Sequence, residues 1–256
     1  MKILVTGVFG WTAISIVEAL KQRGHSIVGL DLPSADPLPQ IESLLDAIYL
    51  GSVADFEVVS RAICGCDAVV HLAVAVGEGD YATAQIPFET NVKGTYHIFE
   101  EARRLNHIHK IVLMSSAPVH RIQAGKIINA NTDFLTSADD DHLYDLTKCL
   151  QEHIAHDFCN TFGLNAVVLR AGHIVDGRRG IDPLNRPLAD LNYLRGGWVC
   201  RYDLANAVVK ALDYPKAAYD AFHVIGGSLG RTHFDIERTE RELGYSCAID
   251  FAEFGG

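Results

Sequence analysis

The stretch "KILVTGVFGWTA" (residues 2–13) decides the fold, because an apolar run leads into a glycine-rich turn and then into a helical pattern. Its first letters predict a strand buried on both faces, and residues 12–23 carry apolar side chains at helical spacing. Gly7 permits a tight turn, Gly10 lets the backbone approach a pyrophosphate, and Ala13 is small enough for close packing of helix on strand. This order predicts the first unit of a dinucleotide-binding fold; a turn that merely needs glycine is the alternative.

Apolar runs and segments of helical period alternate along the rest of the chain. The expected strands after the first are residues 25–31, 47–53, 66–74, 110–116, 165–172 and 221–226, and the expected helices are residues 55–63, 88–105, 143–162, 203–213 and 235–243. Continuous Val, Ile and Leu runs between helices are typical of a parallel sheet covered on both faces. We therefore predict an α/β fold with a doubly wound parallel sheet of the Rossmann type. Residues 1–172 would form this domain, and residues 173–256 a small substrate-binding portion interleaved with the last strand and helices.

Composition excludes several classes of protein. The chain has 256 residues and a formal net charge of −10, which argues against a nucleic-acid partner. No apolar run approaches the ~20 residues that a bilayer span needs, so no membrane partner is expected. Met1 and Lys2 lead directly into the first expected strand, so we expect no signal peptide. The six scattered cysteines are typical of reduced thiols, and we expect a cytoplasmic protein.

Asp31 ends the second expected strand, about twenty residues beyond the glycine-rich turn. A carboxylate there can accept hydrogen bonds from the adenosine ribose and would repel a 2′-phosphate. The next residues are Leu32 and Pro33, so no basic side chain follows directly. The pattern favours NAD over NADP as cofactor; a plain surface aspartate at a strand end is the alternative.

Two further patterns carry proton-transfer chemistry. In "HLYDLTK", Tyr144 precedes Lys148 by four places, which makes them neighbours on one helical face. A cation beside a phenol lowers its pKa, so such a tyrosine can exchange protons near neutral pH. Ser115 and Ser116 end the apolar run "KIVLMSS", where ligands sit in open α/β sheets. Chance spacing and ordinary turn chemistry are the alternatives.

Asn91 lies inside the expected helix 88–105 although asparagine is a mediocre helix former. It is either a solvated polar residue or part of a helix distortion that positions Lys148 through a water. Other chemistries fit less well, because the chain has no Gly-x-Ser-x-Gly elbow and no HExxH pattern. No metal site is predicted.

Together the glycine turn, Asp31, "DAVVHLAV", Asn91, "SSA" and the Tyr144–Lys148 pair resemble the short-chain dehydrogenase/reductase superfamily, in its extended NAD-dependent epimerase/dehydratase branch. The resemblance implies that Ser116, Tyr144, Lys148 and Asn91 are catalytic, with Tyr144 as the acid/base. It also implies a set of cofactor-binding positions, in which Lys148 binds the nicotinamide ribose. That set is Gly7, Gly10, Trp11, Thr12, Asp31, Leu32, Ser52, Val53, Leu72, Ala73, Val74, Tyr144 and Lys148.

The chain departs from the family pattern at three places. Ser52 stands where an aspartate usually binds the adenine amino group, so adenine would be held more loosely. His120 and Arg121 replace a common Tyr-Gly, and Ala117-Pro118 replaces the Asp-Glu pair of sugar-nucleotide dehydratases. Dehydration is therefore disfavoured.

The short C-terminal part, "LYDLTKCLQEHIAHDF" and "VVLRAG" look like the uronate dehydrogenases of this branch, although their Ser-Ser-Asn-His signature is Ser-Ser-Ala-Pro here. The leading interpretation is an NAD-dependent oxidoreductase that transfers a hydride from a sugar or sugar acid. A nucleotide-sugar 4-epimerase and a non-catalytic NAD-binding sensor are the alternatives.

The segment "HIVDGRRGIDPLNRP" gathers His173, Arg178, Arg179 and Arg186 after an expected strand. Arginine's planar fork suits a carboxylate or phosphate, so His173, Arg178 and Arg179 are, with Ser116, the candidate substrate-binding residues for an anionic sugar. A solvated loop is the alternative. The two longest expected helices carry apolar residues on more than one face, and from this we expect a homodimer.

Overall fold

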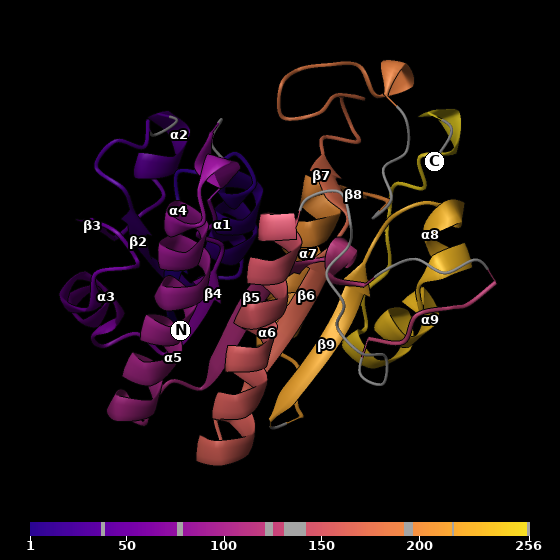
Figure 1. Ribbon diagram of the computed structural model, residues 1–256. Coiled ribbons are helices and arrows are strands. Elements are labelled where there is room, and N and C mark those ends of the chain that lie inside the picture. Colours follow the sequence, from indigo (N-terminus) through magenta and orange to yellow (C-terminus); the bar gives the residue numbers. More distant parts are fainter. Residues whose placement is uncertain are drawn as a thin grey trace.

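A seven-stranded parallel sheet forms the centre of the molecule (Figure 1). The computed structural model describes residues 1–36, 39–75, 79–120, 125–130, 142–191, 197–216 and 218–254. The strands of the sheet are β1 (Lys2–Thr6), β2 (Ser26–Asp31), β3 (Ala47–Leu50), β4 (Ala68–His71), β5 (Lys110–Ser116), β6 (Ala166–Ala171) and β9 (Tyr219–Val224). Their order is β3-β2-β1-β4-β5-β6-β9, and every neighbouring pair is parallel. The predicted doubly wound Rossmann fold is confirmed.

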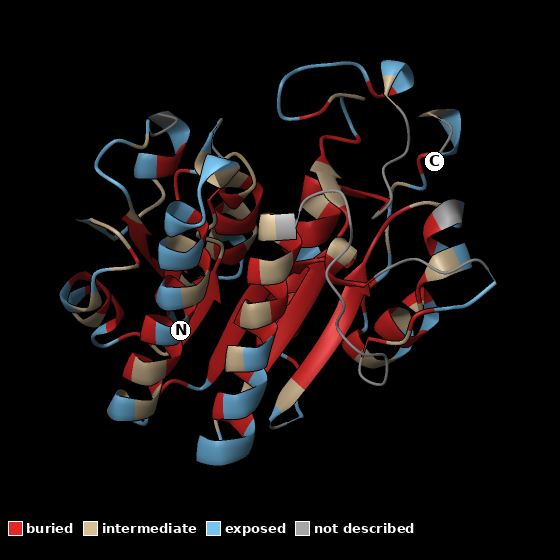
Figure 2. Cartoon of the chain, in the orientation of Figure 1, coloured by how far each residue is buried: buried red, intermediate tan, exposed pale blue. Residues whose placement is uncertain are grey.

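Helices cover both faces of this sheet, because alternate strand residues point to opposite sides. The helices are α1 (Ala13–Gln22), α3 (Phe56–Ile63), α5 (Gly94–Leu105), α6 (His142–Phe162) and α7 (Arg201–Leu212). Ile3 and Val5 of β1 pack with α1 and α7, whereas Leu4 packs on the other face with α3, α5 and α6. Figure 2 shows the sheet buried between the two layers, which explains why its strands read as continuous apolar runs.

The expected helix 88–105 is divided. Its first part is a π-helical turn, η2 (Phe88–Lys93), and α5 begins at Gly94. A Cβ at Gly94 would lie 2.5 Å from Val53 Cγ2, so the start of α5 approaches the segment after β3 closely. The expected helix 235–243 is also divided, but here the π-helical part comes last: α9 (Ile236–Arg238) is followed by η5 (Thr239–Leu243).

Residues after 172 contribute to two places in the molecule. Strands β7 (His173–Val175) and β8 (Trp198–Cys200) form a separate two-stranded parallel sheet, which the sequence pattern did not predict. Helix α7 packs on α1, and β9 completes the main sheet beside β6. The shorter elements are α2 (Pro39–Glu42), α4 (Gln85–Pro87), α8 (Ser228–His233), η1 (Asp80–Ala82), η3 (Ala117–Val119), η4 (Leu188–Asp190) and η6 (Ala252–Phe254).

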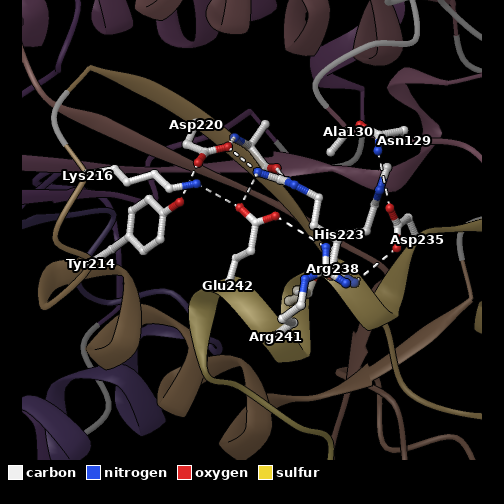
Figure 3. A network of polar contacts seen from close by, with 12 residues as sticks. Asn129, Ala130, Tyr214, Lys216, Asp220, His223, Asp235, Arg238, Arg241 and Glu242 are labelled. Carbon is white, nitrogen blue, oxygen red and sulfur yellow. Dashed lines mark hydrogen bonds and ion pairs between the residues drawn. The ribbon is translucent and has the colours of Figure 1, made fainter.

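A polar network attaches the last helices to β9 (Figure 3). The Arg238 guanidinium donates to the Asp220 carboxylate at 2.6 Å and to the carbonyl oxygen of Ala221 at 2.7 Å. Lys216 and Glu242 form a second ion pair at 2.9 Å. The edge strand β9 is thereby held by side-chain contacts as well as by its backbone pairing with β6. Within the described ranges, no helix is both long and apolar enough to cross a membrane.

Candidate active site

The glycine-rich turn lies at the carboxyl ends of β1 and β4, where the strand order reverses. Gly7 has a φ of 66°, and a Cβ there would lie 2.9 Å from the backbone N and Cα of Ala73. Its N–H donates to the carbonyl oxygen of Leu30 at 2.9 Å. Only glycine fits this left-handed conformation and close approach. The turn is therefore built as a tight backbone cradle.

Asp31 and the start of α1 border the same cradle. The Asp31 carboxylate accepts hydrogen bonds from the N–H groups of Phe9 and Leu32, both at 2.8 Å. It has lone pairs left for further donors. The Thr12 side chain does not cap α1, and the uncapped N–H groups of a first helical turn bind anions. This combination suits a dinucleotide, with its pyrophosphate on the helix and its ribose on the carboxylate.

The other predicted cofactor positions follow the carboxyl ends of neighbouring strands. Leu72 and Ala73, just after β4, donate their N–H groups to Thr6 Oγ1 at 3.2 Å. Ser52, after β3, accepts a hydrogen bond from the N–H of Ala54 at 3.1 Å. The remaining positions at this edge are Gly10, Trp11, Leu32, Val53 and Val74. All of them lie at one edge of the sheet, beside the cradle.

Asn91 is fully buried in the π-helical turn η2. Its Oδ1 accepts a hydrogen bond from the N–H of Ala75 at 2.9 Å, and its Nδ2 donates to Thr147 Oγ1 at 3.0 Å. The solvated alternative is therefore wrong, and a helix distortion is present. The amide joins the end of β4 to α6 through Thr147, the residue before Lys148.

Lys148 points from α6 to the end of β5. Its Nζ donates to the carbonyl oxygen of Met114 at 3.0 Å and lies 5.9 Å from the centroid of the Tyr144 ring. Burial lowers the pKa of Lys148 to about 8, although the nearby Glu152 charge opposes the shift. Ser116 ends β5 two residues after Met114 and is buried. The structure thus gathers a phenol, an ammonium group and the end of the strand that carries the serine.

Ser115 faces a different partner. Its Oγ donates to Glu152, which also forms a buried ion pair with Arg170 at 2.7 Å. Tyr219 donates its hydroxyl to the same carboxylate at 2.9 Å, and Arg170 Nη1 donates to His120 Nε2 at 2.6 Å. Burial alone would raise the pKa of Glu152, but the charge and hydrogen bonds of Arg170 outweigh burial and lower it. This hub joins β5, α6, β6 and β9 below the site.

Sequence reasoning missed the Glu152–Arg170 hub, although one signal was present. Arg170 interrupts the apolar run "VVLRAG", and a charged residue in a buried strand requires a partner. A second missed residue is His71, which lies within hydrogen-bond distance of Thr6 Oγ1 (2.7 Å) and Thr95 Oγ1 (3.1 Å). Burial lowers the pKa of His71 to about 3, so its imidazole is neutral and joins β1, β4 and α5.

The residues of the "HIVDGRRGIDPLNRP" segment have different surroundings. Arg178 lies 3.8 Å above the Tyr202 ring and lines a groove between α1 and α7. Arg186 pairs with Asp182 at 2.6 Å, whereas Arg179 is exposed. His173 is partly buried, and burial lowers its pKa. The substrate-binding assignment of His173, Arg178 and Arg179 stays a prediction.

No cluster of three or more His, Cys, Asp or Glu side chains that could hold a metal ion occurs in the part of the chain that the structure describes. The polar groups at the cradle are those of a dinucleotide site: backbone N–H groups and a helix N-terminus as donors, and one carboxylate as acceptor.

The fold and this site define an NAD-dependent enzyme of the short-chain dehydrogenase/reductase type. Residues 3–183 match the model of the NAD dependent epimerase/dehydratase family. The chain belongs to this family, and the resemblance inferred from its motifs is confirmed.

Named relatives of similar length are sugar dehydrogenases. The chain is 26% identical to an L-arabinose 1-dehydrogenase (NAD(P)(+)) from Haloferax volcanii, over 95% of each chain. It is 25% identical to a uronate dehydrogenase from Pseudomonas syringae pv. tomato, over 96% of this chain and 81% of the relative. A solved structure of uronate dehydrogenase from Agrobacterium tumefaciens, a mutant complexed with NAD, has the same fold with a TM-score of 0.77 and 20% identity. That comparison covers 99% of this chain and 87% of the other.

Proposed function

We propose that the protein oxidises a sugar or a sugar acid by transferring a hydride to NAD. The observation that carries this proposal is the contact of Lys148 with Met114, which brings the Tyr144 helix to the end of β5. The two dehydrogenases of similar length support the substrate class. The uronate dehydrogenase among them favours a sugar acid, as do the arginines of the segment after β6.

The residues around the cradle fit NAD. Gly7, Gly10, Trp11 and Thr12 would hold the pyrophosphate, and Asp31 the adenosine ribose. Leu32, Ser52 and Val53 would border the adenine side, and Leu72, Ala73 and Val74 the cleft after β4. When bound, NAD supplies the hydride acceptor.

The remaining roles belong to the chain's own proton carriers. Tyr144 would take the proton from the substrate hydroxyl as the hydride leaves the same carbon, and Ser116 would hold the substrate oxygen in line. Lys148 would stabilise the phenolate and bind the nicotinamide ribose. Asn91 would position α6 through Thr147, because its amide bridges that helix to the end of β4.

A screen with absorbance of NADH as readout tests the proposal. Free aldoses, uronates and nucleotide-sugars are offered with NAD, and a uronate or aldose is expected to reduce it. A hexuronate should exceed the matching hexose in kcat/KM, because a lost charge-assisted hydrogen bond lowers efficiency roughly 10- to 150-fold. Arg178→Ala and Arg179→Ala should narrow that gap.

Three outcomes would overturn parts of this proposal. Interconversion of nucleotide-sugars without net NADH would make the protein a 4-epimerase. Tight NAD binding with no turnover of any sugar would make it a sensor. An equal kcat/KM for hexuronate and hexose, in the wild type and in both arginine variants, would contradict the proposal that the substrate is anionic.

We also propose that two copies associate through the face formed by η2, α5 and α6. Phe88 and Tyr96 are 37% and 47% exposed there, and they line an apolar groove together with Val92 and Ile154. Large apolar side chains gathered on one surface are typical of an interface. The homodimer expected from the sequence would form through this face.

A further inference from the structure

The Arg201 guanidinium lies against aromatic rings at the start of α7. Its central carbon is 4.2 Å from the centroid of the Trp11 ring and 5.6 Å from that of the Tyr202 ring. Arg178 covers Tyr202 at 3.8 Å. These four side chains alternate cation and ring, and they connect the loop after β7 to the glycine-rich turn. Arg201 is the member that touches the turn.

Arg201 differs from the other buried arginines of the described chain. Arg170 pairs with Glu152 at 2.7 Å, and Arg238 pairs with Asp220 at 2.6 Å. Within the described residues no hydrogen bond or ion pair is formed by the Arg201 guanidinium, and its Nε is buried without an acceptor. A buried charge without a partner is destabilising. An anion placed beside this guanidinium would therefore be stabilising.

The backbone around Arg201 fixes this charge and makes its position less favourable still. Arg201 is the first residue of α7, where the helix dipole is positive and disfavours a cation. Ser15 Oγ lies 3.1 Å from the carbonyl oxygen of Arg201 and 3.0 Å from that of Thr12, which ties the start of α7 to the start of α1. Both helix starts and the guanidinium thus add positive potential beside the cradle.

We propose that Arg201 binds the pyrophosphate of NAD together with the glycine-rich turn. The inference rests on the NAD binding that family membership shows, and it adds a charged side chain to a site otherwise made of backbone N–H groups. The two phosphate groups would supply a counter-charge for the guanidinium, whose Nε has no acceptor among the described residues. The planar guanidinium suits a phosphate, and the Trp11 ring holds that plane in place.

Calorimetric titration of the cofactor-free protein with fragments of the dinucleotide tests this assignment. ADP-ribose and ADP carry the pyrophosphate, and adenosine does not. Arg201→Met should weaken ADP-ribose and ADP roughly 10- to 100-fold and leave adenosine unchanged, because a charge-assisted hydrogen bond is lost. Arg201→Lys should bind with intermediate affinity. Arg23→Met, which removes an exposed charge far from Trp11 along α1, should behave as the wild type.

A second readout uses no ligand. Arg201→Met removes a charge without orphaning a carboxylate, so the cofactor-free variant should lose only the contacts with the two rings, and its melting temperature should fall by less than that of an arginine variant that leaves a carboxylate unpaired. Arg170→Met and Arg238→Met leave Glu152 and Asp220 unpaired, and both should melt at lower temperature. A fall in the melting temperature of Arg201→Met as large as those of the other two variants would mean that the guanidinium has an ionic partner within the protein, which overturns the inference.

The binding data separate the remaining outcomes. Unchanged ADP-ribose affinity in Arg201→Met, or an equal loss for adenosine, would overturn the inference while leaving the proposed function intact. Weakened binding of a hexuronate alone would assign Arg201 to the substrate and overturn it as well. Failure of the wild type to bind NAD or ADP-ribose would overturn the proposed function itself.

Discussion

Lys148 Nζ donates a hydrogen bond to the carbonyl oxygen of Met114, at 3.0 Å. The contact joins α6 to β5 two residues before Ser116, and the lysine is only 3% exposed. The ammonium group lies 5.9 Å from the centroid of the Tyr144 ring. The proton-transfer chemistry proposed for this chain begins with that pair.

Removal of the Tyr144 hydroxyl should abolish most turnover. Tyr144→Phe keeps the ring but not the proton carrier, so kcat should fall about 100-fold or more. NAD affinity, measured by calorimetry, should stay within a few-fold of the wild type. Tyr96→Phe, at an exposed tyrosine of α5, is the matched control and should keep its kcat. Near-normal turnover of Tyr144→Phe would assign the proton to another group.

Asp31→Ala should weaken the discrimination between the two dinucleotides. The carboxylate repels a 2′-phosphate, and its loss should narrow the ratio of the NADP and NAD dissociation constants. NAD affinity should also fall, because Asp31 holds the turn through the Phe9 N–H. Asp36→Ala, on the following loop, serves as control. Similar wild-type affinities for NAD and NADP would contradict the prediction.

The buried Lys148 should make stability depend on alkaline pH. Its pKa is about 8 in the folded protein and 10.5 as the ordinary value, so between these pH values the unfolded chain binds more protons. The contribution of Lys148 to the free energy of unfolding should therefore not change with pH below pH 8. Between pH 8 and pH 10.5 it should increase by roughly 3 kcal/mol.

Urea denaturation of the wild type and Lys148→Met from pH 7 to 10 measures this effect. At pH 7 the free energy of unfolding of the variant should equal or exceed that of the wild type. As the pH rises, that of the wild type should increase relative to that of the variant. Lys21→Met, at an exposed pair, should run parallel to the wild type. A wild-type minus Lys148→Met difference that does not change with pH would refute the assignment.

Breaking the buried Glu152–Arg170 ion pair should lower the free energy of unfolding far more than breaking an exposed ion pair. Glu152→Gln leaves a buried guanidinium without its counter-charge, and unfolding should become easier by about 3–5 kcal/mol. Lys21→Met breaks an ion pair whose side chains are 30% and 46% exposed, and about 1 kcal/mol or less is expected. Equal losses in the two variants would show that the buried hub is not a stability centre.

Introducing charged side chains tests the proposed dimer face. Phe88→Glu combined with Tyr96→Glu places carboxylates in the apolar groove and should convert a dimer to a monomer in light scattering. Leu184→Glu alters a still more exposed apolar residue, on a loop away from this face, and should leave the mass unchanged. A wild-type monomer at micromolar concentration would contradict the dimer.

The sequence predicts the sheet and the cofactor turn well because both are encoded locally. The strand before Gly7 and the helix after it follow one another along the chain, and β5 begins and ends where its apolar run does. Strands β7 and β8 have three residues each, too few for a periodic signal. Their pairing brings together segments more than twenty residues apart.

The site was predicted less completely because its contacts join distant segments. The π-helical turn at Asn91 is fixed by hydrogen bonds to Ala75 and Thr147, and neither is a neighbour in the sequence. Arg201 reaches Trp11 across 190 positions. Arg178 and Arg186 are close in the chain, yet one stacks on Tyr202 and the other pairs with Asp182.

The Glu152–Arg170 hub has a consequence for how relatives of this chain diverge. Either charge alone is harmful, since its loss leaves the other buried without a partner. We therefore expect relatives to keep both charges or to replace both. Aligned relatives should show the two positions exchanging together, with Tyr219 losing its hydroxyl in the same branches, because that hydroxyl donates to the same carboxylate.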